Sequence, residues 1–409
     1  MNVLYLTYDG LLDPLGQSQI LPYLYGLAQR LGVAFDIVSF EKAERRSHEA
    51  ALRQELLRFE IRWHPLSFTR KPPILSKAYD AWRFFWAAEQ VVRTRPIDFL
   101  HARSYVGGWV AHRISQRYGK PWLFDMRGFW ADERRETRAW PPGHLFYEQL
   151  YAIWKKRERI MLRSASHVIV LTQAAKTFLI QAGIPAEKIS IIPCVADYDH
   201  FQPYFAQRTL YRQRLNLPPD AYVLGYLGSI GALYEVKEML RFFQVLQRLR
   251  ADTYMVFFTP ASAETVYAYA DAVGVPRERL RVSFIPRAEV PLWCSVMDTS
   301  IIFCRPGFSR IGSFPTRVAE VLAMNIPIVM QADLGDNRLL AQQVEGIYLC
   351  ESFTTQAYER VAQLLLDAQH QNGLSSPRHT SQALLSLPIG LSRYEQVYKQ
   401  LKLAPQRLA

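Results

Sequence analysis

The chain has 409 residues, of which 49% are hydrophobic and 21% charged, and its formal net charge is +12 at pH 7. A chain of this length can hold two domains of roughly 200 residues, each with its own core. The hydrophobic fraction excludes an intrinsically disordered protein. Neither a leader-like start nor an apolar run near the ~18 residues of a membrane-spanning helix is found. We therefore expect a two-domain cytoplasmic protein.

The first recognisable unit lies at the N-terminus. Residues 2–7 have a strand-like pattern, residues 8–19 form a loop that contains Gly16, and a helical pattern follows through residues 21–31. A glycine between a strand and a helix lets the backbone approach a ligand closely, here a sugar or its phosphate. A lone glycine is a weak signal, because it can also simply mark a turn.

Apolar runs alternate with helical stretches along the whole chain, which predicts parallel sheets covered by helices on both faces. The expected strands of the first half are residues 2–7, 34–39, 97–101, 122–126, 167–171 and 189–193. The pattern breaks at 194–203, and strands resume near 222–228, 254–259, 281–285, 300–304, 326–330 and 347–350. An amphipathic helix with no strand after it ends the chain. These patterns predict an N-terminal domain at 1–200, a second domain at 201–380 and a tail at 381–409 that packs back across the junction.

A second strand, loop and helix unit spans residues 301–320. The loop is rich in Gly, Pro and Ser and enters the helix through Pro315, which is tolerated in a first helical turn. The unpaired N–H groups of a helix start bind anions. Ser313, Arg317 and Glu320 follow helical spacing and are expected on one face. This pattern suits a sugar nucleotide, with its diphosphate at the helix start and its ribose on Glu320. The competing interpretations are an ion pair of Glu320 with Arg317, and a capping role for Ser313 and Thr316.

The basic balance, with a pI near 9.5, favours an anionic partner. We expect no nucleic acid, because no zinc-finger spacing, RNA-recognition signature or basic helix–turn–helix is present. Segments 68–95 and 140–159 combine aromatic and cationic residues, as do helices that lie on anionic membranes. Equally, these aromatics can belong to the core and the cations to the solvated surface. The four cysteines show no paired spacing and are expected to be reduced.

Several short motifs, taken in their order and spacing, resemble glycosyltransferase family 4, whose members are retaining enzymes of the GT-B fold. The likeness extends over nearly the whole chain. It rests on Leu15-Gly16, on residues 101–104 and 124–133, on Gly228-Ser229-Ile230-Gly231, and on residues 313–329. The resemblance implies an α/β architecture of two Rossmann-like parallel-sheet domains that face a cleft, with a C-terminal helix crossing back to the N-domain. It also implies sugar transfer from a nucleotide diphosphate to an acceptor hydroxyl.

The chain departs from the family pattern at its acidic and histidine positions. Family members usually carry two glutamates separated by seven residues; the second is Glu320, but the first position holds Gly312. In the N-domain, Arg103 and Arg127 replace family histidines, whereas His101 remains. These departures are typical of a subgroup rather than of an inactive enzyme.

The family's Arg and Lys after the first strand of the second domain are also absent. Ser229 occupies the Arg position, and Tyr234 falls near the Lys position. Because a diphosphate leaving group needs compensating positive charge, we assign that role to Arg305 and Arg317, with Arg310 in reserve.

The resemblance therefore implies the catalytic residues Glu320, Arg305, Arg317, His101 and Arg127. For His101 and Arg127 a purely structural role is an open alternative. The residues expected to bind the donor are Gly16, Gly228, Ser229, Gly231, Ile285, Pro286, Arg287, Ser313, Phe314, Pro315, Thr316, Arg317 and Glu320. We expect neither a metal nor another cofactor. The Asp-x-Asp at 197–199 lies in the interdomain linker and is taken as a false positive.

The expected partners are a nucleotide sugar, a glycan or lipid-linked acceptor and an anionic membrane surface, which would make the protein peripheral at the inner face of the membrane. The process would be synthesis of a cell-surface glycan or glycolipid. Two rival functions are a nucleotide-sugar epimerase of the same fold and a non-catalytic module that binds a nucleotide sugar or a membrane surface. Release of nucleotide diphosphate would separate a transferase from a module, and a glycosylated product would exclude an epimerase.

Overall fold

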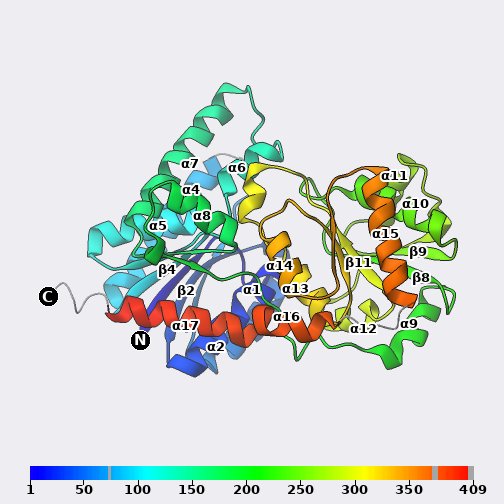
Figure 1. Cartoon of the computed structure of the whole chain (residues 1–409). Coiled ribbons are helices and arrows are strands. Elements are labelled where there is room, and N and C mark those ends of the chain that lie inside the picture. Colours follow the sequence, from blue (N-terminus) through cyan, green and yellow to red (C-terminus); the bar gives the residue numbers. More distant parts are fainter. Residues whose placement is uncertain (72–74, 371–375, 404–409) are drawn as a thin grey trace. The chain divides into compact units, whose positions relative to one another are not determined.

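The chain forms two compact units, each built on one parallel sheet (Figure 1). The computed structural model describes residues 1–71, 75–370 and 376–403. Unit 1 comprises Met1–Pro193, Phe308–Ser313 and Leu387–Ala409, and unit 2 comprises Cys194–Gly307 and Phe314–Ser386. Two α/β units with parallel sheets confirm the expected fold class.

Unit 1 contains a seven-stranded sheet in the order β3-β2-β1-β4-β5-β6-β7. Six of the seven strands were expected from the sequence. The missed strand, β3, contains Arg62, His64 and Pro65, and it lies at the edge of the sheet, where a proline is tolerated. The strands are β1 (Asn2–Thr7), β2 (Ala34–Glu41), β3 (Arg62–Ser67), β4 (Phe99–Arg103), β5 (Trp122–Asp125), β6 (His167–Val170) and β7 (Ile189–Ile191).

Side chains alternate between the two faces of this sheet, so each face needs its own cover. Leu4 and Leu6 join a core with residues of α4, α5 and α7. On the other side α2 packs against α17, and the ring of Phe99 meets that of Tyr398. The helices are α1 (Pro14–Gln19), α2 (Leu21–Leu31), α3 (Glu49–Leu57), α4 (Leu75–Thr94), α5 (Ser104–Tyr118), α6 (Trp130–Glu136), α7 (Leu145–Ser164), α8 (Gln173–Gln181) and α17 (Leu387–Leu403).

Unit 2 contains a six-stranded sheet in the order β10-β9-β8-β11-β12-β13, and all six strands were expected from the sequence. They are β8 (Tyr222–Leu227), β9 (Thr253–Phe258), β10 (Leu280–Ser283), β11 (Thr299–Ile302), β12 (Ile328–Gln331) and β13 (Ile347–Cys350). The helices are α9 (Arg208–Arg214), α10 (Val236–Leu249), α11 (Ala263–Asp271), α12 (Val290–Cys294), α13 (Thr316–Ala323), α14 (Asn337–Gln343), α15 (Thr355–His370) and α16 (Pro377–Leu385).

Both sheets reverse their strand order beside their first strand, between β1 and β4 in unit 1 and between β8 and β11 in unit 2. All of the strand pairs are parallel, so the carboxyl ends of neighbouring strands meet at one edge. In open α/β sheets, ligands bind at this edge where the order reverses. The two strand, loop and helix units of the sequence begin at β1 and β11, and therefore lie at these two points.

The cysteines are free and buried, as expected for reduced thiols. Within the described ranges, every helix is too short or too polar to cross a membrane.

The contact between α2 and α17 gives a direct test of packing in unit 1. A Cβ at Gly26 would lie 2.4 Å from Cδ1 of Leu391, so a larger residue must displace the Leu391 side chain of α17. We expect Gly26→Val to destabilise unit 1 by about 1–3 kcal/mol through overpacking. The shift of the urea-unfolding midpoint measures this cost. Gln29→Val, on an exposed position of the same helix, is the control, and equal shifts in both variants would contradict the packing account.

Candidate functional site

In unit 2, the loops that follow β8 and β11 are joined by hydrogen bonds where the strand order reverses. The backbone N–H of Arg305 donates to the carbonyl of Leu233 at 2.8 Å. The side chain of Gln331 contacts Cys304 twice, accepting from its N–H at 2.6 Å and donating to its carbonyl at 2.7 Å. These bonds satisfy backbone groups that strand pairing leaves open, and so hold the two loops in a fixed position.

Arg317, in the first turn of α13, is held against the loop after β8. Its guanidinium donates to the hydroxyl of Tyr226 at 2.6 Å and to that of Tyr234 at 3.0 Å. Tyr226 in turn donates to the carbonyl of Ser229 at 2.7 Å. Gly228 has φ +123°, and a Cβ there would lie 2.4 Å from Cζ of Arg317. Only glycine therefore fits at this position, and Arg317 lies beside the residues that the sequence assigned to phosphate.

The helix α13 begins one residue later than the sequence suggested. Pro315 is the N-cap, with φ −65° and ψ 124°, and lies outside the first turn, which begins at Thr316. Ser313 belongs to the segment that is part of unit 1, where its hydroxyl donates to the carbonyl of Ser309 at 3.4 Å. The expectation that Ser313 shares a helix face with Arg317 was wrong, because the helical spacing was continued through Pro315.

Glu320, one turn into α13, is buried and pairs with Arg287 rather than with Arg317. Nη1 of Arg287 donates to Oε1 of Glu320 at 2.9 Å. The Arg287 guanidinium also lies 5.1 Å from the centre of the Phe201 ring. Ile285, Pro286 and Arg287 connect β10 to α12 and bring the segment expected to hold the base to Glu320.

The other donor-binding residues differ in how tightly they are held. Arg305 is half-exposed, and its Nε lies 3.3 Å from Oε1 of Glu235. Gly231 has open space where a Cβ would stand, so packing does not require a glycine there. Phe314 is buried at the entry to α13.

In unit 1, a buried ionic cluster lies at the carboxyl ends of β4 and β5. Asp125 has no exposed surface, and its carboxylate oxygens lie 3.5 Å from Nη1 of Arg103, 3.6 Å from Nη1 of Arg127 and 3.7 Å from Nε2 of His101. Burial alone would raise the pKa of Asp125, but the neighbouring positive charges and hydrogen bonds lower it. Arg127 has φ +60°, a conformation that costs a non-glycine residue free energy. The cluster therefore contains one carboxylate among three potential cations.

Two tyrosines of α17 complete this cluster, and the sequence reasoning missed both. The hydroxyl of Tyr394 donates to Asp125 at 3.0 Å, and that of Tyr398 lies 2.7 Å from Nδ1 of His101. Burial lowers the pKa of His101, so its imidazole is neutral at pH 7. The signal in the sequence was the position of both tyrosines on the apolar face of the last helix, among residues assigned to packing alone.

Gly16 was expected in a loop over residues 8–19, but it lies in the short helix α1, packed against the loop that precedes this helix. A Cβ there would stand 2.2 Å from the carbonyl oxygen of Gly10 and 2.7 Å from Cα of Leu11. Glu41, also missed by sequence reasoning, fixes the same loop by accepting from the N–H of Leu11 at 2.8 Å and from that of Leu12 at 3.2 Å. Gly16 therefore permits a close approach between two parts of the protein backbone, at Gly16 and at residues 10–11.

The segment 308–313 explains the absence of the family's first glutamate. A Cβ at Gly312 would lie 3.0 Å from the ring of Phe129 and 3.2 Å from Cα of Gly128, so any side chain there requires these neighbours to shift. Arg310 is paired with Glu133 at 2.9 Å. The cation kept in reserve for the diphosphate is thus held in unit 1 by a carboxylate.

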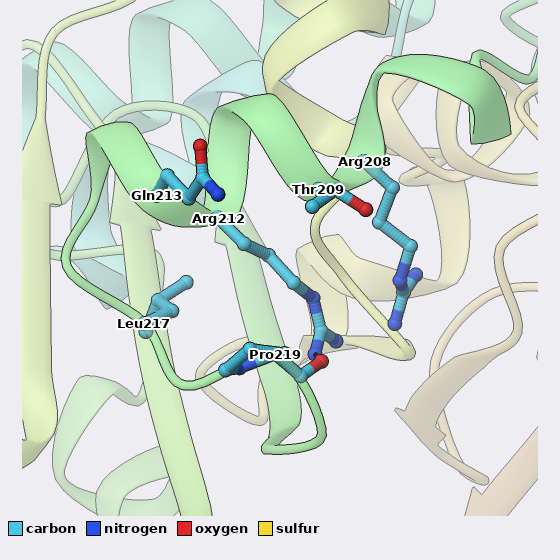
Figure 2. Close-up of a pocket in the computed structure, with 6 residues that line it drawn as sticks. All are labelled: Arg208, Thr209, Arg212, Gln213, Leu217 and Pro219. Atoms are coloured by element: carbon cyan, nitrogen blue, oxygen red, sulfur yellow. Dashed lines mark hydrogen bonds between the residues drawn. The ribbon is translucent and has the colours of Figure 1, made fainter.

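Figure 2 shows a small pocket in unit 2 away from these residues, lined by α9 and the loop that follows it. Its volume is about 60 Å³. Arg208 and Arg212 on its wall both bind the carboxylate of Asp298, at 2.5 Å and 2.9 Å. These arginines connect α9 to the sheet, and the pocket contains none of the expected site residues.

Comparison with known proteins gives a family-model match over part of the chain and a shared fold over nearly all of it. Residues 16–195 match the family model described as Glycosyl transferase 4-like domain. No curated protein matches the sequence closely enough to serve as a relative.

Solved structures share the fold over nearly the whole chain. The Anabaena protein Alr3699/HepE, in complex with UDP and glucose, has a TM-score of 0.71 at 14% identity and covers 98% of this chain and 100% of its own. Sucrose-phosphate synthase from Thermosynechococcus elongatus has a TM-score of 0.72 at 15% identity, with 99% and 100% covered. A glycosyltransferase from Rickettsia africae ESF-5 has a TM-score of 0.66 at 15% identity, with 98% of both chains covered.

The buried cluster predicts a large cost when its single carboxylate is neutralised. Asp125→Asn would leave the guanidinium groups of Arg103 and Arg127 buried without that charge, and we expect unit 1 to lose about 3–5 kcal/mol of stability. Asp9→Asn is the matched control, because Asp9 also faces Arg103, at 3.6 Å, but is 41% exposed. Its cost should stay below about 1 kcal/mol. Chemical denaturation measures both values, and a loss at Asp125 no larger than at Asp9 would contradict the cluster's role.

Proposed function

We propose that the protein is a retaining hexosyltransferase that uses a nucleotide diphosphate sugar, because residues 16–195 match the model of a glycosyl transferase 4-like domain and the chain has the GT-B fold. The observation that carries the proposal is the arrangement at the start of α13. There Arg317 is held beside Gly228, and Glu320 lies one turn further along the same helix. The UDP and glucose in the HepE complex support this class of donor.

The donor would bind in unit 2 with each of its parts at a different group. A carboxylate accepts hydrogen bonds from two neighbouring hydroxyls, and Glu320 is buried and positioned by Arg287 to accept them from a ribose. The segment 284–287 would contact the base. The diphosphate would meet the N–H groups at the start of α13, where the helix dipole adds to the charge of Arg317.

The proposed reaction exchanges one bond at the sugar's anomeric carbon for another. The bond from that carbon to the phosphate oxygen breaks, and a bond to the acceptor oxygen forms on the same face. The acceptor proton passes to the departing diphosphate, so that no protein nucleophile is needed. Negative charge builds on the diphosphate as its bond breaks, and a cation fixed in advance stabilises that charge.

Two arginines would supply this charge without a metal ion. Arg317 is the better prepared of the two, because two tyrosine hydroxyls orient it before the donor arrives. Burial raises the pKa of Tyr226, which therefore stays a neutral hydrogen-bonding partner at physiological pH. Arg305 is half-exposed and shares its charge with Glu235, so its contribution should be smaller.

The acceptor would be a glycan or a lipid-linked sugar bound through unit 1, in the synthesis of a cell-surface glycan or glycolipid. The two guanidinium groups of Arg103 and Arg127 and the neutral imidazole of His101, at the end of the sheet, support an acceptor or sugar with anionic or hydroxyl groups. A peripheral position at the cytoplasmic face of a membrane fits such a lipid-linked acceptor.

Product analysis separates this function from its rivals. A transferase releases nucleotide diphosphate and forms a glycosylated product that keeps the anomeric configuration of the donor. An epimerase would return an altered sugar with no acceptor product, and a binding module would leave the donor intact. Thermal-shift measurements with UDP, GDP, ADP and dTDP sugars would first identify the base.

The ribose assignment predicts a specific loss of affinity in Glu320→Gln. Removing a charge-assisted hydrogen bond costs about 1.5–3 kcal/mol, so calorimetry should find nucleotide affinity lowered about ten- to a hundredfold. Glu289→Gln, an exposed carboxylate near the segment 284–287, should bind as the wild type does. Unchanged affinity in Glu320→Gln would remove the ribose assignment.

The charge assignment predicts an unequal effect on turnover. Arg317→Met should lower kcat by about 10²–10³, the usual effect of removing one preorganised transition-state group, and Arg305→Met by about tenfold. Nucleoside affinity should change only a few-fold in both. Arg241→Met, which removes an exposed arginine paired with Glu238, serves as the control. Wild-type turnover in both Arg317→Met and Arg305→Met would refute the assignment.

A further inference from the structure

The helix α4 of unit 1 has a buried face and an aromatic exposed face. Its inner face joins the core through Phe84, Ala88 and Val91. On the outside, Tyr79 is 51% exposed and Trp82 is 57% exposed. Trp86, at 50%, continues the same side, since spacings of three and four place residues on one helix face.

The three rings form one continuous ridge. The ring centres of Tyr79 and Trp82 lie 6.0 Å apart in a stacked arrangement, and those of Trp82 and Trp86 lie 6.1 Å apart edge to face. The chain has nine tryptophans, all within the described residues, and only Trp82 and Trp86 are exposed. Large aromatic side chains gathered on one exposed patch indicate a surface that meets an apolar or interfacial partner.

The acidic residues of α4 lie on its buried side, whereas basic residues reach the surface. Both of its acids, Asp80 and Glu89, are fully buried and tied to groups of the protein. Arg93, by contrast, is exposed, and the half-buried Arg83 stands 5.4 Å from the centre of the Tyr79 ring. Lys77 is exposed too, but its Nζ lies 3.7 Å from the centre of the Phe68 ring. The outer face of α4 therefore carries positive charge and aromatic rings without an exposed carboxylate of its own.

Helix α5 packs between α4 and a second helix of similar character, α7 (Figure 1). The sequence assigned the aromatic and basic residues of α7 to a membrane surface, but several of them serve the interior. Trp154 packs on Trp130, and Lys155 binds Asp132 at 2.8 Å. The exposed side of α7 is formed instead by Leu145, Phe146, Ile153, Lys156 and Arg159.

We propose that the ridge of Tyr79, Trp82 and Trp86 on α4 inserts into the headgroup region of an anionic lipid bilayer. Tryptophan and tyrosine favour this region because each combines an apolar ring with a polar hydrogen-bonding group. The flanking cations are attracted by anionic headgroups, and the burial of both acids removes the repulsion that such a surface would exert. The proposal deepens the proposed function, since it places unit 1 where a lipid-linked acceptor lies.

Vesicle flotation with the full chain, without nucleotide, tests the proposal. Wild-type protein should bind vesicles of phosphatidylcholine with phosphatidylserine at low salt, and binding should fall as salt rises. Tryptophan emission should shift to shorter wavelength on binding, because the two exposed indoles leave water. The double variant Trp82→Ser/Trp86→Ser should bind at least tenfold more weakly and lose the shift. Phe205→Ser, at a 57% exposed aromatic in unit 2, is the matched control and should bind like the wild type.

Two results would overturn the proposal. One is failure of the wild type to bind anionic vesicles at low salt. This result would also overturn the proposal if the ridge mediated self-association that the double variant abolished. The other is equal vesicle binding by the double variant and the wild type. Nucleotide affinity of the double variant should match that of the wild type. If the wild type binds vesicles but turns over no nucleotide sugar, the proposed function would be wrong and the membrane proposal would stand.

Discussion

The structure depends on one constraint, that parallel strands must be connected by crossovers that return to the same end of the sheet. Each βα loop therefore emerges at one edge, and the reversal of strand order leaves two of these loops beside each other. In unit 2 those loops carry Gly228 and Arg305, and in unit 1 the same edge carries Gly16 in α1 and Arg103 at the end of β4. The chemistry assigned to the protein uses positions that the topology had already brought together.

In unit 2, the positive charge at the start of α13 is held in place by hydrogen bonds from Arg317 to two tyrosines. Arg317 is oriented by the hydroxyls of Tyr226 and Tyr234. Burial raises the pKa of Tyr226, which therefore stays neutral beside the guanidinium. Arg310 is tied to Glu133 and contributes its charge to unit 1. Under the proposed function, Arg317 of α13 would supply the positive charge that the family's Arg and Lys provide.

The sequence predicted twelve of the thirteen strands, because buried parallel strands are continuous apolar runs that a pattern reveals. It missed β3, which lies at the edge of the unit 1 sheet and contains Arg62, His64 and Pro65. In the candidate site it identified Glu320 and Arg317, whose spacing is local. It could not give the partners of Glu320, Arg310 or His101, since each lies in a distant part of the chain. The glycine at 312 looked like a missing carboxylate in the sequence, whereas the structure shows that a Cβ there would lie tightly against the ring of Phe129.

The central claim is that unit 2 binds a nucleotide diphosphate sugar at the end of its sheet where β8 and β11 meet. Hydrogen–deuterium exchange with and without the nucleotide sugar that gives the largest thermal shift tests it most directly. The account predicts slower exchange in residues 228–235, 284–287 and 315–320, with little change around the pocket at 208–219. Protection confined to that pocket, or the absence of protection at the start of α13, would contradict it.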